Sequence, residues 1–135
     1  MVDFQIEATL NSPLIRLESD AGRILIQGRS TPESSIGIYF PVIEKVKKLF
    51  ANVPRIDVTI SLLYFNTSSS KCLFDLFKEL KRLERRGAEL SVHWYYEHDD
   101  EDMLETGEDY ADILDLPFHF HPLIQMDNDS TPIAC

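Results

Sequence analysis

Apolar residues along this chain alternate in some segments and recur at helical spacing in others, a pattern that predicts an α/β domain. PLIRLES (13–19) and GRILIQG (22–28) alternate on either side of a short turn and predict a hairpin, and FQIEATL before them predicts an edge strand or an extended arm. IDVTISLLYF (56–65) is apolar on both faces towards its end, which is typical of a central strand covered by helices on at least one side.

Two segments predict amphipathic helices. The first follows the polar stretch TPESS, and its apolar residues at helical spacing are Ile36, Phe40, Ile43, Val46 and Phe50. Pro41 conflicts with an uninterrupted helix there, so we expect a kink or a later start. The second helix, over about 69–86, ends at Gly87 and carries one apolar stripe of Leu73, Leu76, Phe77, Leu80 and Leu83.

The C-terminal third continues the alternation of strands and helices. AELSVHWYYE (88–97) predicts a strand parallel to 56–65, because a helix separates the two. HDDEDMLETGEDYADILD (98–115) predicts an acidic, interrupted helix, and PFHFHPLI (117–124) a last strand. We therefore expect a mixed four- or five-stranded sheet flanked by helices, in the order β-β-α-β-α-β-α-β, with one domain over 1–124 and a flexible tail over 125–135.

The net charge of −10 is distributed unevenly. All 13 Lys and Arg lie within residues 1–86, whereas residues 87–135 hold 13 acidic residues and no Lys or Arg. The acidic half argues against nucleic-acid binding and favours a basic protein partner or solubility alone. With no membrane-length apolar stretch and no signal-like N-terminus, we expect a cytoplasmic protein without membrane insertion, in which Cys72 is a small buried residue.

The most informative polar stretch is YFNTSSSK (64–71), at the junction of the central strand and the second helix. Thr67 or Ser68 would serve as a helix N-cap, which needs only one such residue. The candidate loop residues are Asn66, Thr67, Ser68, Ser69, Ser70 and Lys71. This surplus of polar groups at a helix start indicates a surface that is read or modified, since helix N-termini accommodate added negative charge.

A second constellation keeps an enzymatic alternative open. His119 and His121 share one side of a predicted strand and, with His93 and the acidic run 97–105, would suit a small metal-dependent hydrolase. The run does not match an EF-hand, and we interpret it as a solvated helix start, with docking of a basic partner by segment 97–112 as a second hypothesis. The chain contains no Gly-rich phosphate loop and no G-x-S-x-G motif, so the residues themselves indicate no cofactor or catalytic group.

GRSTPESS, LLYFNTSSSKCLFDLF, VHWYYEHDDEDMLETGEDY and LPFHF resemble the SiaC family of bacterial regulatory phosphoproteins, over about residues 9–124. The resemblance implies a STAS-like fold, a non-enzymatic role in signal transduction and modification of Thr67, the threonine of the N-T-S motif. It further implies a cognate kinase and phosphatase as partners, and an unmodified form that binds and activates a diguanylate cyclase in cyclic-di-GMP signalling and biofilm regulation.

Overall fold

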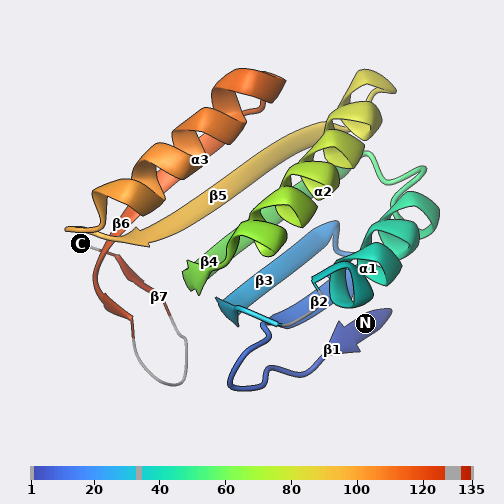
Figure 1. Ribbon diagram of the computed structural model, residues 1–135. Helices are drawn as coiled ribbons and strands as arrows, with labels where there is room; N and C mark the ends of the chain where they lie inside the picture. Colours follow the sequence, from blue (N-terminus) through green and yellow to red (C-terminus); the bar gives the residue numbers. More distant parts are fainter. Residues whose placement is uncertain (1, 33–34, 127–131, 135) are drawn as a thin grey trace.

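The structure, a computed structural model, describes residues 2–32, 35–126 and 132–134. One seven-stranded sheet has its strands in sequence order, and three helices pack on it (Figure 1). The strands are β1 (Phe4–Ile6), β2 (Leu14–Glu18), β3 (Arg23–Ser30), β4 (Arg55–Phe65), β5 (Glu89–Glu97), β6 (Phe118–Met126) and β7 (Pro132–Ala134). The helices are α1 (Ser35–Leu49), α2 (Thr67–Arg85) and α3 (Glu101–Leu114).

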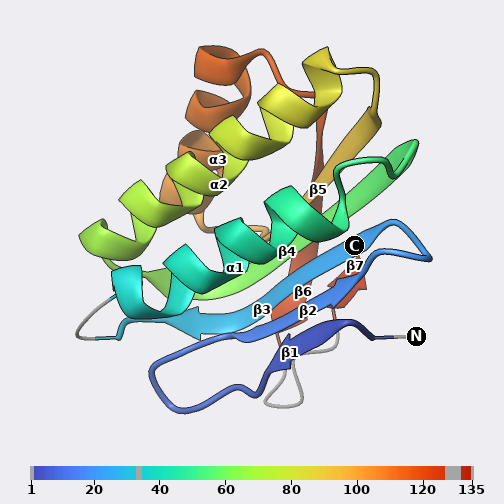
Figure 2. The ribbon, with the colours of Figure 1, turned by 90° about the vertical axis from the view of Figure 1, so that its right-hand side faces the viewer.

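All three helices lie on the same face of the sheet, which leaves the opposite face without a helix (Figure 2). The four strands β3, β4, β5 and β6 run parallel, with one helix between each successive pair, while β1, β2 and β7 pair antiparallel at the two edges. The carboxyl ends of the parallel strands therefore point to the edge of the sheet at which the helices begin.

The predicted fold class is confirmed, but the predicted number of strands is too low. The hairpin β2–β3, the parallel strands and the order of the three helices match the expectation. β1 is the edge strand that was one of the two alternatives for FQIEATL, and it covers only three of those residues. β7 adds a further strand of three residues, which is too short for a hydrophobic period to be recognised. Residues 132–134 of the predicted flexible tail thus pair with β6, whereas 127–131 and 135 lie outside the described residues.

The core lies between β4 and α2, as the sequence predicts. β4 is the fourth of the seven strands, and alternate residues from Ile56 to Leu62 are at most 1% exposed. The apolar stripe of α2 is buried against it: Leu73, Leu76, Phe77, Leu80 and Leu83 are each no more than 2% exposed. The second helix begins at Thr67, two residues earlier than predicted.

Helix α1 differs from the prediction in where it begins and in which of its faces is buried. It begins at Ser35 and continues through Pro41, so the predicted late start is wrong. Its buried positions are Ser35, Tyr39, Val42 and Val46. Ile36 and Phe40, which the spacing placed with the apolar face, are 69% and 59% exposed.

Helix α3 runs without interruption from Glu101 to Leu114, so the interruption predicted there is wrong. Gly107 lies inside the helix at its contact with the fully buried Trp94, where a Cβ would come 2.7 Å from the indole Nε1. The same Nε1 donates a hydrogen bond of 3.0 Å to the carbonyl of Met103. Gly107 therefore permits close packing of α3 on β5 and does not break the helix.

Candidate switch site at the start of helix α2

The β4–α2 junction lies beside the end of β3 and the first turn of α1. The backbone N–H of Asn66 donates to the carbonyl of Ser30, the last residue of β3, over 3.0 Å. The Asn66 side chain donates to the carbonyl of Pro32 over 3.2 Å. The turn is thus held to the chain that leads into α1.

Asn66, and not Thr67 or Ser68, is the N-cap of α2. Its backbone is extended, with φ −84° and ψ 175°, and its Oδ1 accepts a hydrogen bond of 2.9 Å from the N–H of Ser69. This correction has a physical reason: an N-cap needs an extended backbone and an acceptor that reaches the third helical residue, and Asn66 already provides both. Thr67 and Ser68 are therefore not needed as caps.

Ser69 lies at the centre of a buried hydroxyl network. It is 0% exposed, and its hydroxyl donates to the carbonyl of Ser30 over 2.9 Å. The same Oγ lies 2.8 Å from the Oγ of Ser30 and 2.8 Å from the Oγ of Ser35. The Oγ of Ser30 in turn lies 2.8 Å from the hydroxyl of Tyr39. Helix α2 is joined in this way to both β3 and α1.

The next two residues, Ser70 and Lys71, have separate positions. The Oγ of Ser70 lies 2.7 Å from the hydroxyl of Tyr110 on α3, and this hydroxyl donates to the carbonyl of Ser70 over 2.9 Å. Lys71 is exposed on the first turns of α2. Ser70 therefore joins α2 to α3, and Lys71 is a surface cation near the turn.

Thr67 and Ser68 are the exposed hydroxyls of the group. The Oγ of Ser68 lies 2.9 Å from that of Ser35 and donates to Asn66 Oδ1 over 3.2 Å. The hydroxyl of Thr67 makes no hydrogen bond to any residue within 2–32, 35–126 or 132–134. Of the five polar residues that the sequence offers at 66–70, three have structural partners in the interior or cap the helix, and of the two exposed hydroxyls only that of Ser68 has hydrogen-bond contacts within the described residues.

The buried phenols of the network stay protonated at physiological pH. Burial raises the pKa of Tyr39 to about 12, against a smaller opposing effect of its hydrogen bond with Ser30. Burial raises the pKa of Tyr110 too. Cys72, which the sequence predicts to be buried, is 6% exposed and burial raises the pKa of its thiol. These three side chains, below the turn at residues 66–70 that we call the switch turn, are therefore uncharged.

Sequence reasoning missed the apolar residues exposed around this turn. Ile36 and Phe40 are exposed on the first turns of α1, and Ser35, the first residue of that helix, contacts Ser68. Tyr64, near the end of β4, is 54% exposed and lines a hollow of about 190 Å³ beside the start of α3. The hydropathy pattern places both Ile36 and Phe40 in the core, and only the proline that follows Phe40 conflicts with that prediction.

The acidic run begins helix α3, as the sequence predicts. Asp100 is the N-cap and accepts a hydrogen bond of 3.1 Å from the N–H of Met103. Glu101 and Asp102 form the first turn, where their charge complements the helix dipole. Asp100 and Asp102 line the same hollow as Tyr64.

The histidines of the hydrolase alternative are separated from these acids by the sheet. Trp94 points to the helices, so its neighbour His93 and the His93 contacts His119 and His121 lie on the helix-free face. Burial lowers the pKa of His121, and the neighbouring His93 and His119 lower it further. Among the residues that the structure describes, no three His, Cys, Asp or Glu side chains are arranged to hold a metal ion.

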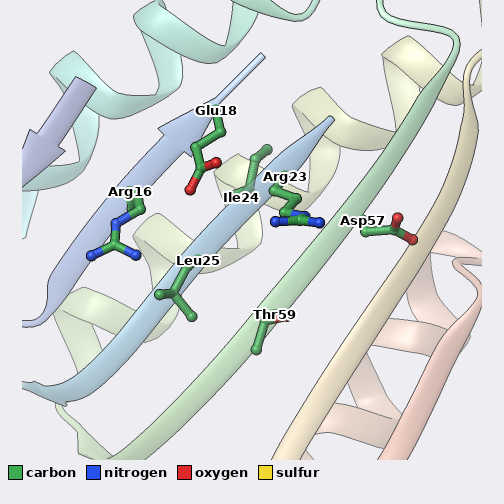
Figure 3. Close-up of a pocket in the computed structure, with 7 residues that line it drawn as sticks. All are labelled: Arg16, Glu18, Arg23, Ile24, Leu25, Asp57 and Thr59. Carbon is green, nitrogen blue, oxygen red and sulfur yellow. The ribbon is translucent and has the colours of Figure 1, made fainter. Parts of the chain in front are cut away.

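A further hollow of about 290 Å³ lies across β2, β3 and β4 (Figure 3). Figure 3 shows side chains of both charges around it, from Arg16, Glu18, Arg23 and Asp57, beside Leu25 and Thr59. Arg55 Nε lies 3.7 Å from the Asp57 carboxylate, so one of these acids already has a cation nearby.

In the described chain, no helix is long and apolar enough to span a membrane.

The protein is thus a small α/β domain with an exposed threonine hydroxyl at the start of a helix. A sequence model of the SiaC family regulatory phosphoprotein matches residues 6–123, and the chain belongs to this family. The family expectation from the sequence is thereby confirmed.

Relatives support the same assignment. The chain is 33% identical over 119 residues to an uncharacterized protein of Pseudomonas aeruginosa strain UCBPP-PA14, covering 87% of this chain and 94% of the relative. It resembles SiaC in the crystal structure of the diguanylate cyclase SiaD in complex with its activator SiaC from Pseudomonas aeruginosa. The TM-score is 0.81 at 31% identity, and the match covers 87% of this chain and 98% of that chain. Apo-SiaC from the same organism gives a TM-score of 0.79 at 31% identity, covering 89% and 98%.

Proposed function

We propose that this protein is a non-enzymatic, cytoplasmic activator of a diguanylate cyclase that is switched off by phosphorylation of Thr67. The observation that carries the proposal is the exposure of Thr67 at the first residue of α2, beside hydroxyls that are buried or bonded to the interior. The cyclase as target is supported by the similarity to SiaC, which is described as the activator of the cyclase SiaD.

A phosphate at Thr67 would be tolerated by the fold. The first turn of a helix leaves backbone N–H groups without intrahelical partners, and the helix dipole favours negative charge there. A phosphoryl group adds about −1.5 to −2 charges and three acceptor oxygens at pH 7. Lys71 is exposed one turn further along α2 and supplies a cation on the same helix.

The same phosphate would be unfavourable at an interface built around the bare hydroxyl. Ile36 and Phe40 are exposed on α1, which the contact of Ser35 with Ser68 holds next to this turn. A partner surface that fits the bare hydroxyl has no cation of its own for the phosphate, and it would have to desolvate about two negative charges, which proteins rarely accommodate. Phosphorylation therefore blocks docking by charge and leaves the fold intact. This mechanism needs a kinase that adds the phosphate and a phosphatase that removes it.

The acidic start of α3 adds a second element to the proposed interface. Glu101 and Asp102 are exposed, and Asp100 and Asp102 line the hollow next to Tyr64. Exposed charges at the rim of an interface act mainly on the rate of association. Replacement of Asp99, Asp100, Glu101 and Asp102 by their amides should slow association with the cyclase and weaken its salt dependence, as measured by stopped-flow kinetics at low and high salt. Unchanged kinetics would place segment 97–112 outside the interface.

The assignment of the modified residue is tested in the organism that encodes the chain. Peptide mapping by mass spectrometry of the protein purified from these cells should place the phosphate on Thr67. Thr67→Ala should abolish the modification, whereas the neighbouring Ser68→Ala should retain it as the matched control. A phosphate on Ser68 in the unaltered protein would refute the assignment.

Activation is tested separately with purified diguanylate cyclases of the same organism. Cyclic-di-GMP production should rise with the unmodified protein and with Thr67→Ala, and should not rise with Thr67→Glu or the phosphorylated form. Circular dichroism should show the same fold for all four. If no cyclase responds, the activator role is wrong, and if phosphorylated and bare forms activate equally, the switch mechanism is wrong.

A further inference from the structure

The helix-free face of the sheet carries a row of four aromatic rings on β5 and β6. The ring of Tyr95 stacks on His121, with centroids 4.7 Å apart, and His121 stacks on His93 at 5.1 Å. The ring of His119 lies at the other end of the row and stacks on His93, also at 5.1 Å. Three of the four histidines of the chain thus gather on the face opposite the helices.

Two ring nitrogens in this row point at each other in a hydrogen bond that joins β5 to β6. His93 Nδ1 and His121 Nε2 are 2.9 Å apart, and the contact is partly buried. One of these nitrogens carries the shared hydrogen and the other accepts it, so the accepting nitrogen must be unprotonated. The bond survives when the donor ring takes up a proton on its far nitrogen. It is broken when both rings are charged, because each ring then presents an N–H to the other.

The surroundings of the row offer little to offset added positive charge. Thr59 of β4 lies opposite His93 in the strand register, and neither β6 nor β7 contains an Asp, Glu, Lys or Arg. By strand alternation, the charged residues on the same side of β4 and β5 are Arg55, Asp57, Glu89 and Glu97. Asp57 already has Arg55 Nε at 3.7 Å. In the part of the chain that the structure describes, no carboxylate forms an ion pair with a histidine of the row.

We propose that His93 and His121 form a pH-sensitive contact between β5 and β6, which accepts one added proton and is broken by a second. Burial lowers the pKa of His121, and the nearby His93 and His119 lower it further. As the pH falls, the unfolded chain therefore binds a proton at His121 before the folded protein does, so acid destabilises the fold. The contact is intact above about pH 6.5, the ordinary value for histidine, and weakens below it. It does not depend on the proposed function, since it lies on the face of the sheet opposite the helices.

Nuclear magnetic resonance of the full chain, between about pH 8 and about pH 5, measures the protonation of each ring. The ring resonances are assigned by their absence from His93→Gln and His121→Gln. The pair should take up its protons in two separate steps, with the midpoint of His121 below the ordinary value of about 6.5. The Tyr95 ring resonances should shift with the second step, because this ring stacks on His121. A His121 midpoint at or above the ordinary value, or protonation of both rings in one step, would overturn the proposal.

Urea unfolding at a series of pH values provides a second measurement. As the pH falls below about 6.5, the unfolding equilibrium constant should rise by up to about tenfold per pH unit relative to that of His121→Gln, the slope for one proton bound only by the unfolded chain. The Gln side-chain oxygen still accepts a hydrogen bond from His93 but takes up no proton. His98→Gln is the matched control and should keep the pH dependence, because the His98 ring lies 3.2 Å from the Leu123 carbonyl and outside the row. The same pH dependence in His121→Gln and the unaltered protein would show a hydrogen bond without pH sensitivity. If His121→Gln does not fold, the His121 midpoint of the unaltered protein decides alone.

Discussion

Removal of the Ser69 hydroxyl should destabilise the domain even though Ser69 lies among residues that form the switch turn. The hydroxyl makes three contacts of 2.8 to 2.9 Å, to the Ser30 carbonyl and to the hydroxyls of Ser30 and Ser35. In Ser69→Ala the Ser30 carbonyl keeps the N–H of Asn66 as a donor. The two serine hydroxyls keep other partners within 2.9 Å, in Tyr39 and Ser68.

These remaining partners set the size of the effect. Three lost hydrogen bonds would remove about 3 kcal/mol at the usual net value of about 1 kcal/mol each, and no donor or acceptor needs to be left unsatisfied. We therefore expect Ser69→Ala to lower the free energy of unfolding by about 1 to 3 kcal/mol. Thr67→Ala removes an exposed hydroxyl and should change it by less than about 0.5 kcal/mol.

Ser69→Asp provides the sharper test. It would place a carboxylate at a site that is 0% exposed and surrounded by neutral hydroxyls, without a cation among the contacts. Burial of an unpaired charge costs several kcal/mol, so this variant should be largely unfolded. Thr67→Asp should fold. Urea unfolding, followed by Trp94 fluorescence and far-ultraviolet circular dichroism, measures all four variants. A folded Ser69→Asp with the stability of the unaltered protein would refute the buried network and would restore Ser69 as a candidate for phosphorylation.

Three further variants test the packing and the surface. Gly107→Ala should lower the free energy of unfolding by about 1 to 3 kcal/mol, because the Cβ of the alanine would overlap the buried Trp94 ring. This loss outweighs the better helix propensity of Ala, and a higher melting temperature would contradict it. The pKa of Tyr39 is raised to about 12, so as the pH rises the Tyr39 phenol loses its proton in the unfolded chain before it does so in the folded protein. The free energy of unfolding should therefore fall by roughly 2 to 3 kcal/mol as the pH rises from about 10 to about 12. Tyr39→Phe should show a smaller fall between pH 9 and pH 11, as measured by urea unfolding. Ile36→Ser with Phe40→Ser should leave the melting temperature nearly unchanged and weaken cyclase binding in a titration, whereas unchanged binding would place the interface elsewhere.

The elements that the sequence predicted well are those with a long and regular hydrophobic period. β4 and the stripe of α2 bury their side chains against each other, so burial and hydropathy agree at almost every position. The crossovers between β4, β5 and β6 follow from the helices that separate these strands. The acidic start of α3 was predictable because a local rule, charge at a helix N-terminus, decides it.

The elements predicted poorly depend on contacts between residues distant in sequence. In α1 the buried positions include Ser35 and Tyr39, whose hydroxyls are satisfied by Ser69 and Ser30. A hydropathy pattern cannot anticipate these partners and places Ile36 in the core instead. The sequence predicts the N-cap at Thr67 or Ser68, and not at Asn66, for a related reason. Several neighbouring residues could cap the helix, and only the direction of the chain leaving β4 selects Asn66.

The same buried network explains why a modification at Thr67 would act locally. Asn66, Ser69 and Ser70 fix the first turn of α2 to β3, α1 and α3, so added charge at Thr67 meets a turn with little freedom to move. A switch that refolded α2 would have to break contacts that together stabilise the domain by several kcal/mol, a large part of the stability of a domain this size. A switch that only changes the charge at Thr67 needs no such change. It is reversed when the phosphate is removed, and the docking surface then has its original shape.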